Sequence, residues 1–134
     1  MRYLAVVLFV ALNSFLCFAE SSEQYRACSE KAKTQAEMNA CANQEAGRVD
    51  VELNNVYRKL VSKAASQPET LTKIKAAERA WVAYRDAYID AMYPAKDKQA
   101  EYGSSYPMEV DLLRAKLTQQ QVAAINEMLQ QYSN

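Results

Sequence analysis

One long apolar stripe constrains the fold of this chain more than any other feature. Its residues recur at spacings of three and four over about seven helical turns: Met38, Ala42, Ala46, Val49, Leu53, Val56, Leu60 and Ala64. Such spacing places them all on one face of an α-helix. Thr34 and Glu37 form a capping box before the stripe, so we expect the helix to begin there.

A second long helix is predicted to run back along the first. Ser66, Pro68 and Glu69 resemble a second helix start, with Ser66 as its cap. Pro94 discourages continuation beyond about Tyr93. Because only a few residues connect the two helices, they should form an antiparallel helical hairpin.

The apolar face of this second helix contains an arginine. Ile74, Ala77, Trp81, Tyr88 and Met92 share the face, and Leu71 and Ile89 flank it. Arg85 lies within it, and a buried guanidinium needs an acidic partner. We expect that partner to be Asp50, at the edge of the first helix's apolar face. The sequence therefore predicts a structural polar network, with a binding site as the alternative interpretation, made of Asp50, Asn54, Tyr57, Arg79, Arg85 and Asp86.

The remaining segments complete an all-α prediction of about four to five helices in a small bundle. Residues 21–33 are expected to form a short helix that carries Cys28, and residues 94–107 a polar loop. Residues 111–116 are predicted as a short helix, and Thr118 as the cap of a separate last helix. Gly47 and Gly103 are the only glycines, and such scarcity favours helices over turn-rich β structure.

Residues 1–19 have the pattern of a secretory signal peptide. Arg2 supplies the charged start, residues 4–12 the apolar run, and residues 17–19 a small-x-small cleavage site. The mature chain, residues 20–134, is then one helical domain that begins at Glu20. The alternatives are an uncleaved membrane anchor and a lipid anchor on Cys17.

Two cysteines remain after removal of the signal, and they predict a disulfide. Cys28 and Cys41 are an even number in an oxidising compartment. A continuous helix would separate their Cα atoms by about 20 Å, whereas a disulfide needs roughly 4.4–6.8 Å. The chain must therefore turn back between them; the alternative is two free thiols.

Charge and composition argue against several classes of function. Removal of Arg2 from the 16 basic residues leaves 15 against 16 acidic ones, so no basic footprint for nucleic acid exists. The chain has no histidine, the commonest general base and metal ligand, so neither a metal nor a cofactor is expected. Glu78 and Asp86 lie about 12 Å apart along a helix, beyond the carboxylate spacings of glycosidases. We therefore predict a protein without enzymatic activity.

The best candidate for a binding surface is the stretch from residue 94 to residue 107 with its flanks. Acidic residues outnumber basic ones in this stretch, and its tyrosines are of the kind that protein interfaces favour. We expect Asp97, Glu101, Tyr102 and Tyr106 to contact a partner, and the alternative is a plain connecting loop.

Five short motifs together resemble those of a known family. They are TQxEMNxCA at 34–42, DxELNxxY at 50–57, ERAWxxYRD at 78–86, GSxxPM at 103–108 and LT at 117–118. In this order they are similar to the lysozyme inhibitor LprI-like domain of small secreted bacterial proteins. The resemblance covers nearly all of the mature chain.

One departure from the family pattern concerns a second cysteine pair. The resemblance implies cysteines shortly after the Arg-Asp of the second helix and shortly before the Leu-Thr, where this chain has Ile89 and Leu113. Both substitutes are apolar, so we expect hydrophobic packing between the same two helices in place of a second disulfide.

The resemblance implies a periplasmic or secreted protein that binds lysozyme, a basic muramidase, and blocks its cleft. The acidic, tyrosine-rich stretch suits such a partner electrostatically. The first alternative is an envelope protein-interaction module with another partner and no lysozyme inhibition. The second is an enzyme of the cell wall.

Overall fold

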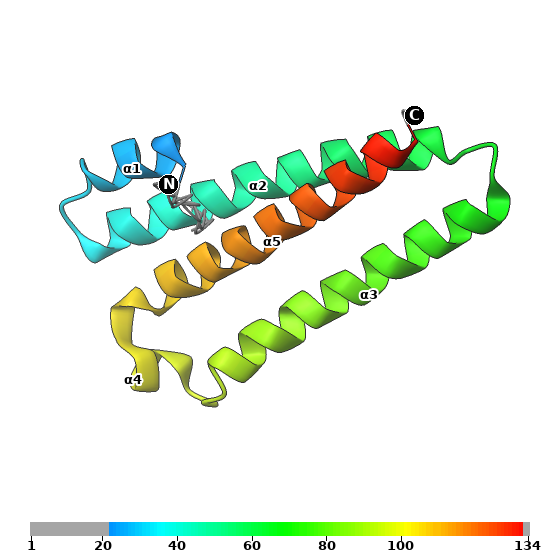
Figure 1. Cartoon of the computed structure of the whole chain (residues 1–134). Coiled ribbons are helices and arrows are strands. Elements are labelled where there is room, and N and C mark those ends of the chain that lie inside the picture. The colour runs from blue at the N-terminus through cyan, green and yellow to red at the C-terminus, as the bar shows by residue number, and fades with distance from the viewer. Residues whose placement is uncertain (1–21, 133–134) are drawn as a thin grey trace, which may run out of the picture.

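The computed structural model describes residues 22–132, and all regular secondary structure within them is helical (Figure 1). Its elements are α1 (Glu23–Ser29), α2 (Gln35–Lys63), α3 (Pro68–Met92), α4 (Lys98–Tyr102), the 3-10 helix η1 (Gly103–Ser105) and α5 (Tyr106–Gln131). The predicted all-α bundle with one disulfide is confirmed. The predicted signal peptide lies outside the described residues. None of the described helices is long and apolar enough to cross a bilayer.

The closest packing in the molecule joins α2 to α5. Figure 1 shows these two helices side by side and parallel, and α3, which connects them in sequence, runs antiparallel to both. The main core lies along this contact and consists of Ala46, Val49, Leu53, Val56, Leu60, Ala64, Ile74, Ala115, Val122 and Ile125. The stripe that the sequence predicts on α2 therefore packs mainly on the last helix of the chain, with Ile74 as the buried contribution of α3.

The return helix α3 contacts the rest of the molecule along a narrow line. Ile74 and Ile89 are its buried residues, and Trp81 is half-buried against the core. The prediction that Ala77, Tyr88 and Met92 belong to the buried face is wrong, because all three are exposed. In Figure 1 α3 runs at a distance from the α2–α5 pair, so one line of side chains makes its contacts.

Packing between α3 and α5 occupies the place where the family resemblance implies a second disulfide. Ile89, Val110 and Leu117 form a second buried cluster, and Leu113 packs against it. The expectation that Ile89 and Leu113 join the two helices through hydrophobic contact is confirmed.

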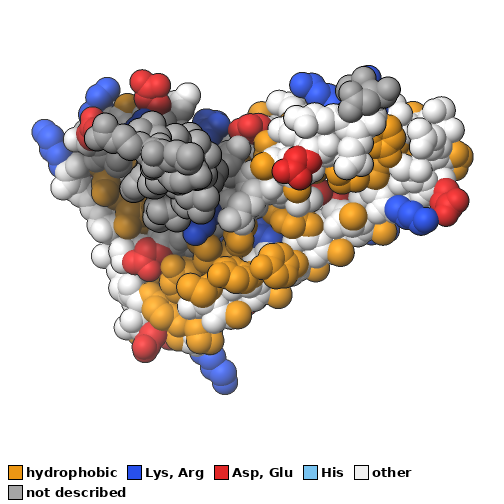
Figure 2. Space-filling model, in the orientation of Figure 1, with side chains coloured by type: hydrophobic (Ala, Val, Ile, Leu, Met, Phe, Trp, Pro, Cys, Tyr) orange, Lys and Arg blue, Asp and Glu red, His pale blue; other side chains and the backbone are white. Residues whose placement is uncertain are grey.

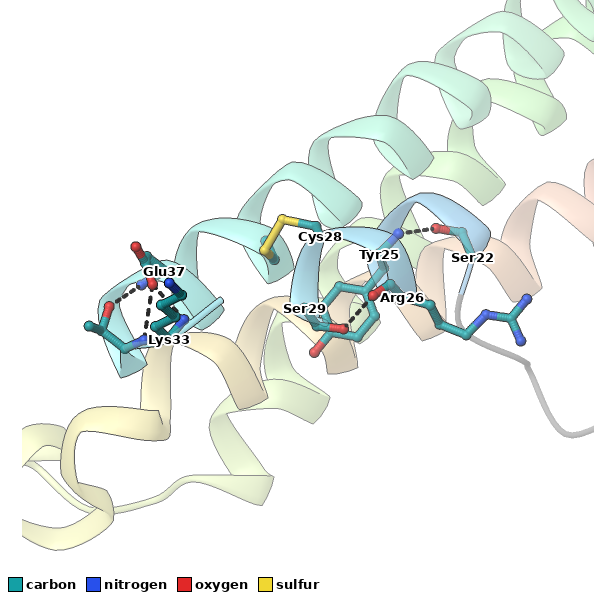
Figure 3. The surroundings of a disulfide bond; sticks show 9 residues. Ser22, Tyr25, Arg26, Cys28, Ser29, Lys33 and Glu37 are labelled. Carbon is teal, nitrogen blue, oxygen red and sulfur yellow. Dashed lines mark hydrogen bonds between the residues drawn. A yellow bond between two sulfur atoms is a disulfide. The ribbon is translucent and has the colours of Figure 1, made fainter. Parts of the chain in front are cut away.

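The disulfide joins α1 to the first turns of α2 (Figure 3). The Cα atoms of Cys28 and Cys41 are 5.7 Å apart, so the chain turns back between them as expected. The capping box is present: the backbone N–H of Glu37 donates to Thr34, and Glu37 accepts from the backbone N–H of Thr34. Glu37 also accepts from the N–H of Lys33, and this bond holds the pKa of Glu37 below its ordinary value.

The segment from residue 94 to residue 107 is more ordered than the predicted loop. Asp97 caps α4 by accepting a 2.9 Å hydrogen bond from the backbone N–H of Ala100. Gly103, with a φ of 71°, ends α4 in the left-handed region that glycine adopts without strain. Asp97 followed by Gly103 is thus a start and stop signal that the sequence analysis missed.

Two predicted helix caps are wrong. Thr118 lies inside α5 and is fully buried, because the apolar stripe of that helix continues on both sides of it with Ala115 and Val122. Its hydroxyl has no hydrogen-bond partner among the described residues. Ser66 lies one residue too early to cap α3, because Pro68 occupies the first helical position and makes Gln67 the N-cap.

Removal of the disulfide should destabilise the protein. Replacing Cys28 by Ser and Cys41 by Ala opens a loop of 13 residues and should lower the free energy of unfolding by about 3 kcal/mol. Urea unfolding of the double variant and of the native protein measures this difference. Equal stabilities, or two thiols that alkylate in the native protein without prior reduction, would contradict the assignment.

The two glycines should respond in opposite directions to replacement by alanine. Gly47 lies within α2, and a Cβ added there meets no atom within 4 Å. Gly47→Ala should therefore stabilise the protein by about 0.5–1 kcal/mol. Gly103→Ala should destabilise it, because alanine is strained at a positive φ. Thermal unfolding of both variants tests the pair, and stabilisation by Gly103→Ala would refute the reasoning.

Candidate functional site

A charged groove lies where α2, α3 and α5 meet. It is a depression of about 490 Å³ lined by Asp50, Arg85, Asp86, Ile89, Asp90 and Arg114. One residue comes from α2, one from α5 and the other four from the C-terminal half of α3. The spacing of the α3 residues follows from helical geometry, since positions three and four apart share one side.

Arg85 occupies the inner side of this groove. Its side chain is 16% exposed, and its guanidinium contacts Asp86 at 2.9 Å and Asp50 at 4.0 Å. The guanidinium carbon also lies 5.2 Å from the ring centroid of Trp81, within the range of a cation–π interaction. Arg85 therefore makes its close contacts within α3 and reaches α2 only through the longer contact with Asp50.

Arg114 is similarly engaged on α5. It contacts Asp111 at 2.6 Å, and Asp111 also accepts a 3.3 Å hydrogen bond from the side chain of Asn43. The Asp111 side chain is 12% exposed, so both donors compensate a largely buried carboxylate. The two arginines of the groove thus have acidic partners within the chain. The side chains of Asp50 and Asp86 are 44% and 59% exposed, and Asp90 is exposed as well.

The other residues of the predicted polar network lie outside this groove. Tyr57 and Arg79 line a separate depression of about 340 Å³ between α2 and α3. Asn54 is exposed on α2. Glu78, which lines the same depression, accepts a 2.9 Å hydrogen bond from Gln121 and so joins α3 to α5.

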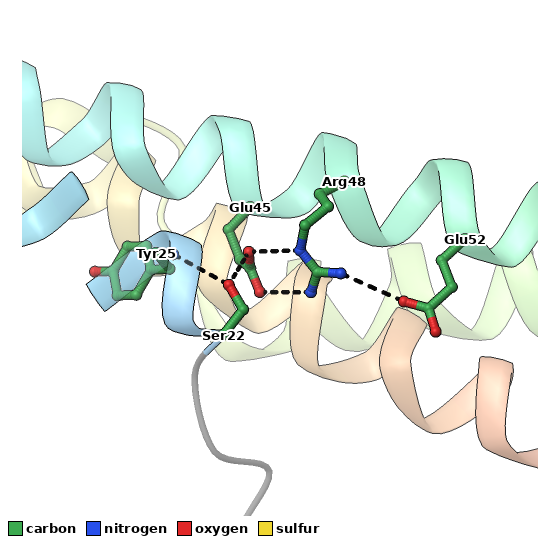
Figure 4. Close-up of polar contacts among 5 residues, drawn as sticks. All are labelled: Ser22, Tyr25, Glu45, Arg48 and Glu52. Carbon is green, nitrogen blue, oxygen red and sulfur yellow. Dashed lines mark hydrogen bonds and ion pairs between the residues drawn. The ribbon is translucent and has the colours of Figure 1, made fainter. Parts of the chain in front are cut away.

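A second network, which the sequence analysis did not identify, joins α1 to α2 (Figure 4). Glu45 accepts a 2.6 Å hydrogen bond from the hydroxyl of Ser22 and contacts Arg48 at 2.9 Å. Arg48 also reaches Glu52 at 3.4 Å. The hydrogen bond from Arg48 holds the pKa of the buried Glu45 carboxyl below its ordinary value. The sequence did contain a signal for this network, because Glu45, Arg48 and Glu52 follow one another at spacings of three and four, which place them on one side of a helix.

The tyrosines of the predicted partner surface pack on one another. The ring centroids of Tyr102 and Tyr106 are 5.6 Å apart, and both rings meet Tyr93 edge-on at 5.2 and 5.3 Å. The hydroxyl of Tyr102 accepts a hydrogen bond from the backbone N–H of Ala95. Burial, together with the nearby Glu109 carboxylate, raises the pKa of Tyr93 above its ordinary value. These tyrosines therefore stabilise the corner between α3 and α5.

Most residues of the predicted partner surface also have a structural role. Tyr102 and Tyr106 are half-buried, and Tyr106 packs against the second core cluster, so their replacement would disturb the fold. Asp97 is the cap of α4, and Glu101 is exposed. The amine of Lys98 donates to the backbone carbonyl of Tyr93.

The chemistry of the groove is that of ion pairing. Within residues 22–132, no cluster of three or more side chains of His, Cys, Asp or Glu could hold a metal ion. Glu78 and Asp86, the carboxylates considered for glycoside hydrolysis, are bonded to Gln121 and Arg85 respectively. The exposed carboxylates of the groove can therefore bind cationic groups of a partner, while its two arginines stay paired within the chain.

The attachment of α3 through Arg85 is open to a double-mutant cycle. Arg85→Ala should lower the free energy of unfolding by about 1–2 kcal/mol, because it removes the contacts with Asp86 and Trp81. Asp50→Ala should cost less than about 1 kcal/mol, because Asp50 is 44% exposed and lies 4.0 Å away. Their coupling should be measurable but below about 1 kcal/mol in urea unfolding.

Lys75→Ala on the exposed side of α3 is the matched control and should be nearly neutral. Strict additivity of the Arg85 and Asp50 effects would mean that the two side chains do not interact.

Comparison with known proteins identifies the same family that the sequence motifs resemble. The family model described as lysozyme inhibitor LprI matches residues 28–125. An uncharacterized protein of Rhizobium meliloti (strain 1021) is 30% identical over an alignment 137 positions long, which covers 92% of this chain and 96% of the relative. No solved structure matches the chain significantly. The match spans both cysteines of the disulfide, all of α2 and α3, most of α5 and every residue of the groove, and the chain belongs to the LprI family.

Proposed function

We propose that this protein is a secreted or periplasmic binding protein that inhibits c-type lysozyme. The observation that carries the proposal is membership of a family described as lysozyme inhibitors. The charge of the groove supports it, because lysozyme is a basic muramidase and complementary charge favours association with such a partner. Inhibition would then follow from occlusion of the muramidase cleft, without chemistry on the substrate.

The groove contains carboxylates that are exposed and make few contacts within the protein, so they remain available to a partner. Within the described residues, Asp90 makes no hydrogen bond or ion pair and is exposed. Asp50 and Asp86 are 44% and 59% exposed, although both lie near Arg85. Arginine side chains of a partner could form charge-assisted pairs with these carboxylates at little cost to the fold.

The corner formed by α4 provides a second acidic position. Asp97 and Glu101 are exposed there. Lys96 and Lys98 lie in the same segment and reduce its net charge. The groove is therefore the stronger candidate for the contact with a basic partner, and the corner is its flank.

Inhibition of c-type lysozyme by the purified mature protein is the direct test. A muramidase assay on bacterial cell walls should show inhibition that saturates at stoichiometric or micromolar excess. Asp50→Asn with Asp90→Asn should slow association and flatten its dependence on salt, since rim charges act mainly on the association rate. Stopped-flow or biosensor kinetics at several salt concentrations measure both effects.

Two further variants remove the same number of charges elsewhere. Asp97→Asn with Glu101→Gln neutralises the corner and keeps a good N-cap for α4, because asparagine caps as well as aspartate. Glu69→Gln with Glu127→Gln neutralises exposed carboxylates outside both positions and should leave association unchanged. Equal effects of all three pairs would indicate attraction by net charge alone and would remove the groove from the proposal.

The alternative function is an envelope protein-interaction module with a different partner. Failure of the native protein to bind or inhibit lysozyme would favour it. Affinity capture from an envelope extract, with the groove variant as control, would then identify the partner that depends on the same carboxylates.

A further inference from the structure

The side of α3 that faces α2 differs in chemistry from the rest of this helix. Figure 2 shows hydrophobic side chains gathered over the lower arm of the molecule, where α3 lies, and Tyr84, Tyr88 and Met92 are exposed on this helix. Towards α2, the C-terminal half of α3 lines the charged groove, and its N-terminal half lines the separate depression of about 340 Å³. The groove and the depression share no lining residue, so the depression is a second candidate site.

The residues that line the depression combine apolar surface with two positive charges. They are Tyr57 of α2 and Lys75, Glu78, Arg79 and Val82 of α3. The four α3 residues follow one another at spacings of three, one and three, which place them within an arc of about 100° on one side of the helix. Tyr57 is half-buried and packs against the main core, so its ring is held in place as one wall of the depression.

The hydrogen-bond donors of the depression have no partner within the chain. Among the residues that the structure describes, Lys75 and Arg79 make no ion pair or hydrogen bond, and the hydroxyl of Tyr57 makes no hydrogen bond. Glu78 lies three residues after Lys75, a spacing that suits an ion pair, yet it is bonded to Gln121 of α5 at 2.9 Å. Three donors, two of them charged, therefore remain available around one depression.

The charges of the depression favour a ligand with a single negative charge. Lys75 and Arg79 outnumber Glu78, so the lining has a net charge of +1. A carboxylate suits the planar guanidinium of Arg79, with which it can form two parallel hydrogen bonds, and it can also accept from the hydroxyl of Tyr57. Glu78 repels a more highly charged anion. The ring of Tyr57 and the side chain of Val82 offer apolar surface to the body of such a ligand.

We propose that the depression between α2 and α3 binds a monocarboxylate with a small apolar body. Arg79 pairs with the carboxylate, Lys75 adds a second positive charge, and the hydroxyl of Tyr57 donates to the same group. The volume lies at the small end of the range for ligand pockets, about 300–1,000 Å³, so the apolar body is small. Because both cations are exposed, we expect a dissociation constant on the order of 1 mM.

Two sources supply this chemistry, a peptide that ends in a small apolar residue and a short fatty acid. Titration of the ¹⁵N-labelled native protein with N-acetyl-alanyl-alanine and with octanoate, followed by NMR, separates them. The tighter ligand of the two identifies the source. At least one should shift the backbone resonances of Tyr57 and of residues 75–82, with saturation in the millimolar range.

Two kinds of control ligand test the two halves of the proposal. The amide of N-acetyl-alanyl-alanine lacks the carboxylate and should not bind. Acetate and inorganic phosphate lack the apolar body and should bind at least about tenfold more weakly than the tighter acid. Absence of saturable shifts with either acid would overturn the proposal. Equal binding of acetate or phosphate would also overturn it, because it would show attraction of anions by charge alone.

Single substitutions remove the donors one at a time. Arg79→Gln should weaken binding at least about tenfold, and Lys75→Gln about threefold, since the guanidinium alone can form the two parallel bonds. Tyr57→Phe keeps the ring and should weaken binding about threefold to tenfold by loss of the hydroxyl. Arg58→Gln removes an exposed positive charge of α2 that does not line the depression, and as the matched control it should have no effect.

Circular dichroism and thermal unfolding of each variant check that the fold is retained. Native affinity of Arg79→Gln, or equal losses of affinity in Arg79→Gln and Arg58→Gln, would refute the assignment of the site.

Lysozyme inhibition is independent of these outcomes, because the groove and the depression have no residue in common. Inhibition by a protein that binds neither acid would refute the carboxylate site and leave the proposed function intact. Binding of an acid without inhibition would do the reverse.

Discussion

Parallel packing of α2 on α5 is the constraint on which the rest of the structure depends. Two parallel helices cannot be joined by a short turn, so the chain must return along the full length of the domain before α5 can begin. α3 makes this return, and α4 with η1 reverses the chain at the corner. The position of α3 is therefore dictated by connectivity, and its contacts with the core are limited to one line of residues.

Specific contacts compensate for the narrow packing of α3. Ile74 and Ile89 anchor it to the two core clusters, and Arg85 ties it to α2 through Asp50 and to its own helix through Trp81 and Asp86. Gln121 adds a bond from α5 to Glu78. The same arrangement leaves a charged groove on one side of α3 and an apolar face on another, and both surfaces remain available for binding.

The candidate site could be predicted only in part from the sequence. Arg85 drew attention because an arginine stood among apolar residues, and Asp50 followed from the need for an acidic partner. Arg114 and Asp90 belong to no local pattern, because the groove exists only once α3 and α5 lie together. The tyrosines of the corner were predicted to contact a partner, and their mutual packing gives them a structural role in that corner as well.

The sequence by itself determined α1, α2 and α3 with their approximate bounds, the disulfide and the family. These depend on local spacing, capping residues and cysteine number, which act over a few turns of chain. Only the tertiary structure decided that α5 is one helix through Thr118, that α2 packs on α5, and which side of α3 faces the core. These outcomes depend on residues far apart in sequence, since a buried threonine or an exposed tyrosine is set by what packs against it, and helical periodicity alone does not identify that partner.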